Sequence, residues 1–296
     1  MNEHRSGIVS LIGKPNVGKS TLINNFIGKK VTIVSPKPHT TQNVIRCILS
    51  LDNAQIIFVD TPGFRKPLNK LDKYVMKVTR NAIYGNDLIL LMLDAQYGLS
   101  KAEVYIVDEL KKVDTPKFLV INKIDAVKGE DKLNILERHM SKSLKLEKIH
   151  YISALKGTGL SKLLEDLVAY LPLSPPLYPP NTTVDASIVF IISELIREKV
   201  MRFTGEEIPH SVAVRVEDIE EKENVYVIYA LIFVERKSQR GIIIGKNGRM
   251  IKRIGTAARE DIECSLGKRV FLDLKVKVKE KWREKDTFIR SIVEVE

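Results

Sequence analysis

Short apolar runs alternate with amphipathic helical patterns through the first 170 residues, and this alternation restricts the fold more than any other feature of the sequence. Several of the runs are apolar throughout, as expected of strands that are covered on both faces of a sheet. Such alternation is typical of a doubly wound α/β fold with a mostly parallel sheet. The expected strands are residues 7–12, 44–51, 55–59, 87–93, 117–121 and 148–152, and the expected helices are residues 19–27, 69–83, 101–111, 132–140 and 160–170.

A proline-rich segment ends this pattern, with five prolines between Pro172 and Pro180. Because proline cannot continue a helix or a central strand and favours an extended spacer, we expect an interdomain linker here. The length of 296 residues suits two domains better than one. We predict a first domain at residues 1–172, a linker at 173–183 and a smaller α+β domain at 184–296. Its expected elements are a helix at 185–199, strands at 211–217 and 225–234, helices at 238–244 and 248–266, and a strand at 270–279.

The most specific motif lies between the first expected strand and the first expected helix, where the sequence reads GKPNVGKS from Gly13 to Ser20. This is the G-x-x-x-x-G-K-S pattern of a P-loop, whose backbone N–H groups face phosphate oxygens at a helix N-terminus. Lys19 is expected to reach the β- and γ-phosphates, and the Ser20 hydroxyl is expected to ligate Mg²⁺. The nucleotide-binding residues predicted here are Gly13, Lys14, Pro15, Asn16, Val17, Gly18, Lys19, Ser20 and Thr21.

A second motif, Asp60-Thr61-Pro62-Gly63, follows the third expected strand. At the end of a strand beside a P-loop, an acidic residue can hold the water shell of Mg²⁺ and a glycine amide can meet the γ-phosphate. We therefore add Asp60, Thr61, Pro62, Gly63 and the next residue, Phe64, to the predicted nucleotide site.

The nucleotide base is expected to be read by Asn122-Lys123-Ile124-Asp125, after the fifth expected strand. The Asp125 carboxylate can accept two hydrogen bonds, from guanine N1–H and from the guanine N2 amine. Adenine lacks this pair of donors, so it would leave a charged acceptor unpaired. The motif therefore predicts GTP rather than ATP, with Asn122, Lys123 and Asp125 as site residues. Past the last strand, Ser153, Ala154 and Leu155 would complete the base pocket with a backbone amide near guanine O6.

In this order, GKPNVGKS, DTPG, NKID and SAL resemble the four motifs of the translation-factor-related GTPases, and they span the first domain. The resemblance implies a switch thread between the first helix and the second strand that contains Thr40 and Thr41. A threonine there contacts Mg²⁺ and the γ-phosphate, and we favour Thr41. The implied Mg²⁺ ligands are Ser20, Thr41 and, through water, Asp60, and the implied catalytic residues are Lys19, Thr41 and Gly63.

Phe64 stands where Ras-like GTPases carry a glutamine that orients the attacking water. A phenyl ring neither donates nor accepts a hydrogen bond of this kind, so we expect slow intrinsic hydrolysis without water positioning by this side chain. Relatives with an apolar residue at this place often carry a P-loop asparagine that ligates K⁺. Asn16 matches that asparagine, which adds K⁺ to GTP, GDP and Mg²⁺ as an expected cofactor.

Positive charge is concentrated in the second domain. The chain has a net charge of +11, and residues 236–285 contain 16 Lys and Arg against 6 Asp and Glu. A basic run alone is about as often a solvated surface as a binding site. This run surrounds a G-x-x-G turn between two expected helices, and such glycines let an RNA backbone approach while the bases rest in an apolar groove. The predicted RNA-binding residues are Ile242, Ile244, Gly245, Lys246, Asn247, Gly248, Arg249, Lys252 and Arg253.

The second domain resembles a type II KH domain, and the whole chain resembles the Era family of bacterial ribosome-assembly GTPases. The resemblance implies a GTP-hydrolysing switch that binds single-stranded 16S rRNA near its 3′ end and assists assembly and maturation of the 30S subunit. DNA is not an expected partner. For the G-x-x-G turn itself, a helix–turn–helix packing element with exposed lysines is the alternative.

Three other functions are compatible with parts of the sequence. An RNA-modification GTPase shares the apolar replacement of glutamine but carries extra catalytic domains, and a non-enzymatic RNA chaperone would use the first domain for binding alone. A membrane GTPase is disfavoured because the longest apolar runs are too short to span a bilayer.

The N-terminus lacks the apolar run of a secretory signal, so we expect a cytoplasmic protein. Its basic surface would permit weak peripheral contact with the inner face of the cell membrane.

Overall fold

The computed structural model describes residues 4–33, 42–129, 131–205, 208 and 211–293, which form two compact units. The described residues of the first unit are 4–32, 42–68 and 72–185. Those of the second run from 186 to 293, with Ile33 and residues 69–71 grouped with them. Each unit has its own hydrophobic core.

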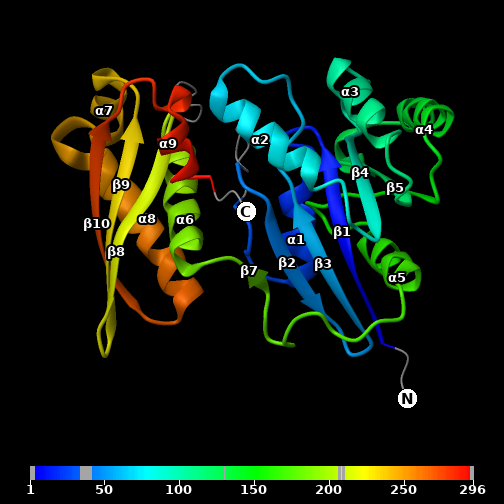
Figure 1. Cartoon of the computed structure of the whole chain (residues 1–296), viewed down its shortest axis with the longest axis horizontal. Coiled ribbons are helices and arrows are strands. Elements are labelled where there is room, and N and C mark those ends of the chain that lie inside the picture. Colours follow the sequence, from blue (N-terminus) through cyan, green and yellow to red (C-terminus); the bar gives the residue numbers. More distant parts are fainter. Residues whose placement is uncertain (1–3, 34–41, 130, 206–207, 209–210, 294–296) are drawn as a thin grey trace. The chain divides into compact units, whose positions relative to one another are not determined.

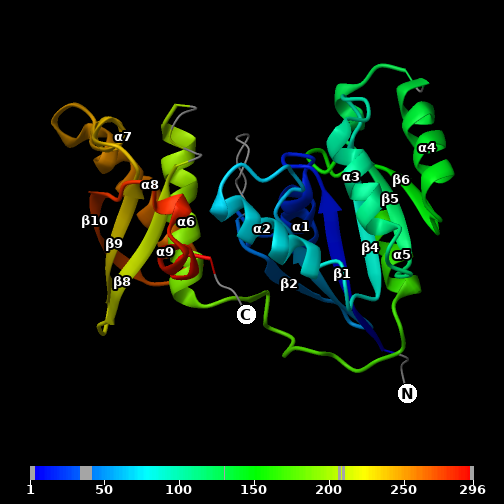
Figure 2. The same ribbon diagram turned by 45° about the horizontal axis from the view of Figure 1, so that its top comes forward.

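The first unit is a sheet with helices on both faces (Figures 1 and 2). Its elements, in chain order, are β1 (Arg5–Gly13), α1 (Lys19–Ile27), β2 (Ile45–Ser50), β3 (Ala54–Asp60), α2 (Lys70–Asn81), β4 (Leu88–Asp94), α3 (Lys101–Leu110), β5 (Lys117–Asn122), the 3₁₀ turn η1 (Ile124–Ala126), α4 (Asp131–Ser143), β6 (Lys148–Tyr151), α5 (Leu160–Tyr170) and β7 (Val184–Asp185).

Strand order in this sheet is β6-β5-β4-β1-β3-β2-β7. The first five strands in that order are parallel to one another, and β2 and β7 are antiparallel to their neighbours. Strands β3, β4 and β5 are buried at every residue, as their continuous apolar sequence predicts. The predicted doubly wound, mostly parallel α/β fold is therefore confirmed.

Alternate side chains of the strands point to opposite faces and meet different helices. On one face, Leu91 and Leu119 pack with Ile106 of α3 and Met140 of α4. On the other, the Phe58 ring stacks on Phe26 of α1, and Phe118 meets Tyr170 of α5 edge to face. In a parallel sheet of this kind, ligands bind at the carboxyl ends of the strands, which is where the P-loop and the DTPG and NKID motifs begin.

The proline-rich segment is hydrogen-bonded along the first unit. The buried Gln55 side chain of β3 accepts hydrogen bonds from the backbone N–H groups of Leu177 and Tyr178, both at 2.8 Å, and donates one to the Tyr178 carbonyl at 2.8 Å. The segment ends in β7, which pairs with β2. The helix expected at residues 185–199 begins later, at Ile188, because the Ser187 hydroxyl caps it by accepting from Phe190 N.

The second unit is a three-stranded sheet covered on one face by the helices α6, α7 and α8 (Figure 1). Its elements are α6 (Ile188–Phe203), β8 (Ala213–Glu221), β9 (Val225–Val234), α7 (Lys237–Ile244), η2 (Lys246–Gly248), α8 (Arg249–Leu266), β10 (Arg269–Val278), η3 (Trp282–Glu284) and α9 (Asp286–Arg290).

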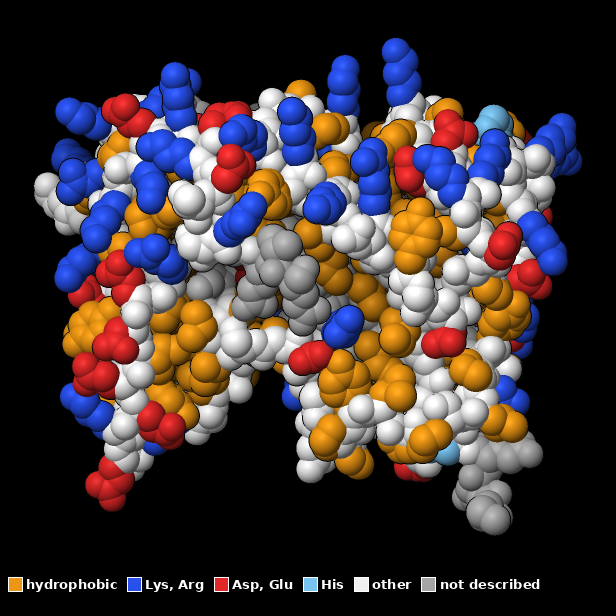
Figure 3. Space-filling model, in the orientation of Figure 1, with side chains coloured by type: hydrophobic (Ala, Val, Ile, Leu, Met, Phe, Trp, Pro, Cys, Tyr) orange, Lys and Arg blue, Asp and Glu red, His pale blue; other side chains and the backbone are white. Residues whose placement is uncertain are grey.

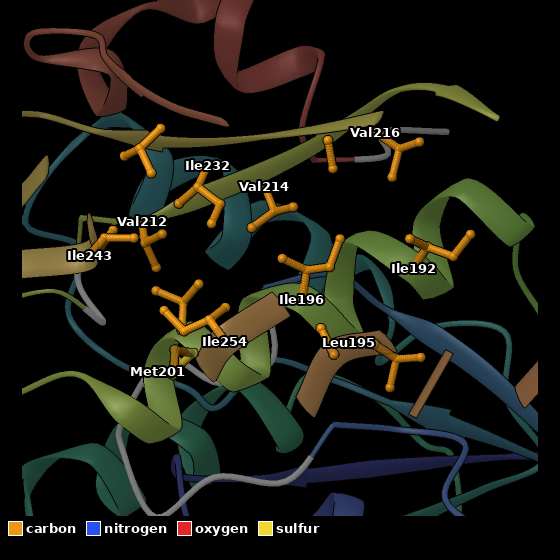
Figure 4. Packing of buried hydrophobic residues seen from close by; sticks show 14 of the residues in the cluster. Ile192, Leu195, Ile196, Met201, Val212, Val214, Val216, Ile232, Ile243 and Ile254 are labelled. Carbon is orange, nitrogen blue, oxygen red and sulfur yellow. The ribbon is translucent and has the colours of Figure 1, made fainter. Parts of the chain in front are cut away.

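Strand order is β10-β9-β8, with β9 parallel to β10 and antiparallel to β8. The α-β-β-α-α-β order confirms the predicted type II KH fold. Figure 4 shows the core, where Ile196 of α6 and Ile254 of α8 pack on Val214 and Ile232 of the sheet.

The short C-terminal elements η3 and α9 have no counterpart in the sequence-based expectations. Trp282 is buried and donates its indole N–H to the Ser211 carbonyl at 3.0 Å, and Phe288 meets both Trp282 and Phe233 edge to face. Phe233 alternates with the core residues Ile232 and Val234, so these contacts lie on the opposite face of the sheet. In the part of the chain that the structure describes, no helix combines the length and the apolarity needed to cross a membrane.

Candidate nucleotide and RNA sites

Lys19 begins α1 and turns its ammonium back into the P-loop. Its Nζ donates to the carbonyl oxygens of Gly13 at 3.4 Å and Lys14 at 3.0 Å. Burial lowers the pKa of Lys19 to about 8, against the opposing effect of the Asp60 carboxylate. A buried cation at a helix N-terminus, inside a loop of backbone N–H groups, suits phosphate oxygens, which would relieve the cost of its burial.

Ser20 and Asp60, the two predicted Mg²⁺ residues that lie within the described chain, are brought together. The Ser20 hydroxyl donates to Asp60 Oδ2 at 2.7 Å. Burial raises the pKa of Asp60 to about 6, although Lys19 and the Ser20 hydrogen bond lower it. Asp60 Oδ1 is buried and lacks a hydrogen-bond partner among the described residues. A hydroxyl beside a buried carboxylate with a free oxygen is a donor set that fits Mg²⁺ and its water shell.

The DTPG motif lies directly against the P-loop. Phe64 N donates to the Gly13 carbonyl at 3.1 Å, and the Thr61 hydroxyl donates to the Leu11 carbonyl at 2.6 Å. A Cβ added to Gly63 would lie 2.1 Å from the backbone nitrogen of Pro15, far inside van der Waals contact. Glycine at this position is therefore required by the close approach of two backbones.

The Phe64 side chain points into the protein core. It is 1% exposed and packs in the apolar cluster that contains Ile12, Leu91 and Ile106, with Tyr105 beside its ring. This placement agrees with the expectation that Phe64 does not orient a water molecule.

Asn122 ties the base-reading motif to the P-loop and to the loop after β6. Its side-chain amide donates to the Val17 carbonyl at 2.7 Å and accepts from Ala154 N at 2.8 Å, and the residue is 2% exposed. The Ala154 carbonyl in turn accepts from Asn25 of α1 at 2.7 Å. One buried amide thus fixes three segments that are far apart in sequence.

Asp125 lies in η1 with an exposed carboxylate, as a base-reading residue requires. Beside it, Ile124 N donates to the Ile152 carbonyl at 3.2 Å, which holds the two base-side loops together. In the second loop Ser153 and Ala154 are buried and Leu155 is 77% exposed. The predicted base-side residues therefore meet at one end of the sheet.

Two acidic residues near the site were missed in the sequence. Asp94, at the end of β4, lies 2.6 Å from Lys123 Nζ. Glu103 of α3 lies 2.6 Å from Lys14 Nζ and also accepts from the N–H and hydroxyl of Ser100. Burial raises the pKa of Glu103, but these hydrogen bonds outweigh burial and leave it below the usual value. Asp94 was detectable as the acidic end of an apolar strand, whereas no local pattern marks Glu103.

Not every predicted residue can be placed. Thr40 and Thr41 lie outside the described residues. Asn16 is exposed at the tip of the P-loop, with a left-handed backbone at φ 62°. Thr41 stays the predicted Mg²⁺ ligand and Asn16 the predicted K⁺ ligand.

In the second unit the G-x-x-G turn links α7 to α8 through left-handed backbone. Gly245, Asn247 and Gly248 have φ values of 71°, 53° and 73°. A Cβ on Gly245 would lie 2.6 Å from Met250 Cβ, so this glycine is required by space as well as by φ. Lys246 and Asn247 are exposed at the turn.

Two shallow grooves border strand β10. The first, of about 710 Å³, has the apolar residues Ile244, Val276 and Val278 beside basic ones, and the second, of about 330 Å³, brings Lys252 to the apolar residues of β10. The first groove contains three basic residues that were not predicted: Lys237, Arg240 and Lys277.

Charge is unevenly placed over the second unit. In Figure 3, Lys and Arg side chains gather over its α7 end and acidic side chains over the tip of the β8–β9 hairpin. Arg253 differs from Lys252, because its guanidinium lies 4.3 Å from the centre of the Phe203 ring rather than in a groove lining. A cation over an aromatic face is a stabilising contact within the unit.

Each of the two units matches a known family. Residues 8–123 match the family described as 50S ribosome-binding GTPase, and residues 207–283 match the KH domain. The chain is 49% identical over 290 residues to GTPase Era of Carboxydothermus hydrogenoformans, with 97% of each chain covered. It is also 49% identical to GTPase Era of Thermotoga maritima, with 96% of this chain and 95% of that protein covered.

Two solved structures share the fold over nearly the whole chain. One is a crystal structure of Era in complex with MgGDPNP and nucleotides 1506–1542 of 16S ribosomal RNA, with a TM-score of 0.94, 38% identity and 98% of each chain covered. The other is Aquifex aeolicus Era bound to GDP and aluminium fluoride, with a TM-score of 0.92, 38% identity and 97% of this chain and 98% of that one covered.

Proposed function

The chain belongs to the Era family of GTPases, and on that premise we propose that it is a molecular switch whose second unit binds single-stranded 16S rRNA near the 3′ end. It is a GTP-hydrolysing enzyme with a C-terminal KH domain. The observation that carries the proposal is the second unit's pair of grooves along β10, which join an apolar floor to a basic rim beside a G-x-x-G turn.

In the first unit, Lys19 and the backbone N–H groups of the P-loop residues other than Pro15 hold the phosphates. Asn122 keeps the P-loop and the 153–155 loop in register with the base reader Asp125. Asp125 accepts from guanine N1–H and the N2 amine, which gives the discrimination against adenine.

Ser20, and Asp60 through water, are the Mg²⁺ ligands that the described geometry supports, with Thr41 as the proposed third. When bound, Mg²⁺ neutralises charge on the β- and γ-phosphates and so stabilises the charge that develops during phosphoryl transfer. Asp60 acts in this way as a carboxylate, and the positive charge of Mg²⁺ would favour that form against the burial that raises its pKa.

Hydrolysis depends on positioning and charge rather than on a side-chain base. Phe64 is enclosed by the core, so the water has to be oriented by other groups, among which we place the Gly63 amide and Thr41. Lys19 holds the γ-phosphate oxygens as charge shifts toward the leaving group. Asn16, exposed at the P-loop tip, is the proposed K⁺ ligand.

The RNA partner is proposed from two observations. The related Era structure was solved with nucleotides 1506–1542 of 16S rRNA over the same fold. This chain has the apolar and basic lining that single-stranded RNA requires, and residues 236–285 carry its charge excess. Binding there would place the protein on the 30S subunit during its assembly, in the cytoplasm, with at most weak contact to anionic membrane lipids.

Base choice is the first test of this function. Competition of ATP against GTP for the unmutated protein should show a discrimination of roughly 10⁴. Asp125→Asn should weaken GTP and favour xanthosine nucleotides, whose N1–H and O2 suit an amide. Competition by ATP within about tenfold of GTP would refute the guanine assignment.

The RNA function is tested by changing Lys246 and Asn247 together to Asp. Repulsion of phosphates should abolish binding to a single-stranded 16S 3′-end oligonucleotide in an anisotropy titration, while GTP affinity and circular dichroism stay unchanged. Unchanged RNA affinity in the folded double variant would refute the KH function. An RNA chaperone that only binds GTP would show no turnover, and an RNA-modification enzyme would alter the bases of the bound RNA.

A further inference from the structure

Asp94 is a buried carboxylate at the carboxyl end of β4, next to the base-reading motif. It is 6% exposed, and one oxygen, Oδ1, accepts from Gln96 N at 2.9 Å. The other, Oδ2, lies 2.6 Å from Lys123 Nζ. The two backbones are also joined, because Asp94 pairs with Asn122 in the sheet and Ala95 N donates to the Asn122 carbonyl at 2.8 Å. These contacts fix the position of both oxygens of the Asp94 carboxylate.

Lys123 is held in a conformation that non-glycine residues rarely adopt, with φ 65° and ψ 35°. Such backbone is strained and persists at functional sites where the surroundings fix it. On one side of it the Asn122 amide is bonded to two loops, and on the other Ala126 N donates to the Lys123 carbonyl at 3.0 Å. The side chain, 33% exposed, is fixed at its end by Asp94.

Two residues later, Asp125 presents an exposed carboxylate. Lys123 is two residues away in sequence, at the same turn, and its side chain is long enough to pair with this carboxylate. An ammonium there would compete with the guanine N1–H and N2 amine for the same oxygens. The pair with Asp94 removes the ammonium from this competition.

We propose that Asp94 is a positioning residue for guanine recognition: it holds the Lys123 ammonium so that the Asp125 carboxylate stays free for the base. The lysine stem is then fixed as one side of the base site. This inference rests on the proposed role of Asp125 as the base reader. Asp94 acts through Lys123 and is not itself proposed to contact the nucleotide or the metal.

The discriminating measurement is the ratio of the dissociation constants of IDP and GDP, by calorimetry with Mg²⁺. Hypoxanthine lacks the N2 amine, so the ratio reports how much of the Asp125 carboxylate is available to that amine. Asp94→Asn keeps the size of the side chain but releases Lys123. We expect GDP to weaken by roughly fivefold, as for a competing exposed ion pair, and the IDP/GDP ratio to fall. Turnover at saturating GTP should stay within about twofold, because the phosphate end is untouched.

A double variant separates positioning from support of the fold. Asp94→Asn with Lys123→Met removes both charges and keeps an apolar stem, so Asp125 has no lysine to pair with. The IDP/GDP ratio should return to that of the unmutated protein. If Asp94 merely supported the fold, the ratio would stay low in both variants, and this result would overturn the proposal.

Asp166→Asn is a matched control. Asp166 is also a nearly buried carboxylate paired to a lysine, with Lys148 Nζ at 2.5 Å, but it lies in α5 away from the base-reading turn. This change should leave both the GDP affinity and the ratio unaltered. An unmutated protein without preference for GDP over IDP would instead refute the assignment of Asp125. With that preference present, a ratio unchanged by Asp94→Asn in the folded protein overturns the role of Asp94 alone.

Discussion

The phosphate and metal side of the nucleotide site is built from buried residues, whereas the RNA grooves carry exposed ones. Lys19, Asp60 and Asn122 are all buried; Lys19 is hydrogen-bonded within the P-loop, and the side chains of Asp60 and Asn122 are each bonded to another motif. In the second unit, Lys246 and Lys252 are exposed, and the grooves beside them are open. Binding of the phosphates and one metal ion depends on buried partners, whereas an RNA backbone can be held by exposed charge and shape. Changes in the first region should therefore produce large losses, and changes in the second graded, salt-dependent ones.

Gly63→Ala should produce the largest loss. A Cβ at this position would lie 2.1 Å from Pro15 N, so the DTPG segment must move away from the P-loop. We expect the turnover number for GTP to fall by at least about 10²-fold, since misplacement of about 1 Å has this effect. Gly98→Ala is the control, because the corresponding Cβ meets nothing within 4 Å. Normal turnover of Gly63→Ala in a phosphate-release assay would show that the contact of the two backbones does not matter.

Asn122→Ala should have the next largest effect, on affinity. It leaves the Val17 carbonyl and the Ala154 N–H without their buried partner. We expect GDP to bind roughly 10²-fold more weakly in a fluorescence titration, with a lower melting temperature. Asn86→Ala, which removes bonds to the Ala82 and Tyr84 carbonyls, should leave GDP affinity unchanged. Equal GDP affinity in both variants would contradict the linking role of Asn122.

Gly245→Ala tests a close approach of the same kind in the second unit. Both the positive φ and the contact with Met250 oppose a Cβ, so the turn should change shape. We expect RNA affinity to fall by roughly tenfold and GTP affinity to stay constant. Gly267→Ala shares the positive φ (66°) but meets nothing within 4 Å, so it isolates strain from shape. The same RNA loss in both variants would mean that strain alone is responsible.

Lys252→Met and Arg253→Met should differ although the residues are adjacent. Lys252 lines a groove, so its loss should lower the RNA affinity about threefold to tenfold. It should also reduce the slope of log affinity against log salt concentration by about one. Arg253 lies over Phe203, so its loss should mainly lower the melting temperature of the second unit. Salt-dependent RNA titrations of the two variants test this, and equal slopes would place Arg253 on the RNA as well.

The smallest expected effect is a pH dependence confined to the first unit. Burial lowers the pKa of His150, and Lys148 and Lys162 add to this against the opposing Asp166. The unfolded chain therefore binds the proton more tightly than the folded one. Stability from the neutral imidazole is complete above about pH 6.5 and is lost as pH falls through the folded-state pKa. His150→Gln should reduce the loss of melting temperature between pH 7 and pH 5. An unaltered pH profile would assign that loss to other groups.

The sequence predicts correctly those features that depend on local patterns of residues. Continuous apolar runs identified the buried strands, and glycine with lysine at fixed spacing identified the P-loop and the G-x-x-G turn. The two-residue strand β7 was missed because it is too short to show a period. The partners of Gln55 lie about 120 residues further along the chain, so no window of sequence contains them. Lys252 and Arg253 look alike in sequence, and only tertiary packing separates a groove residue from one that stacks on Phe203.

The hydrogen bonds of Gln55 also determine how the proline-rich segment resists a pulling force. The proline-rich segment that connects the two units leaves the first unit through β7, whose two residues pair with β2 beside the core strand β3. A pull on the chain from the second unit would load this short pair first and the Gln55 amide next, before any force reached the core. The proline-rich segment would then detach from the sheet edge stepwise and lengthen, while the nucleotide site stayed folded. Its bonds to His4 and Ser6 would yield after those of Gln55. In a stretching experiment Gln55→Ala would remove the second step, so that the proline-rich segment yields at lower force.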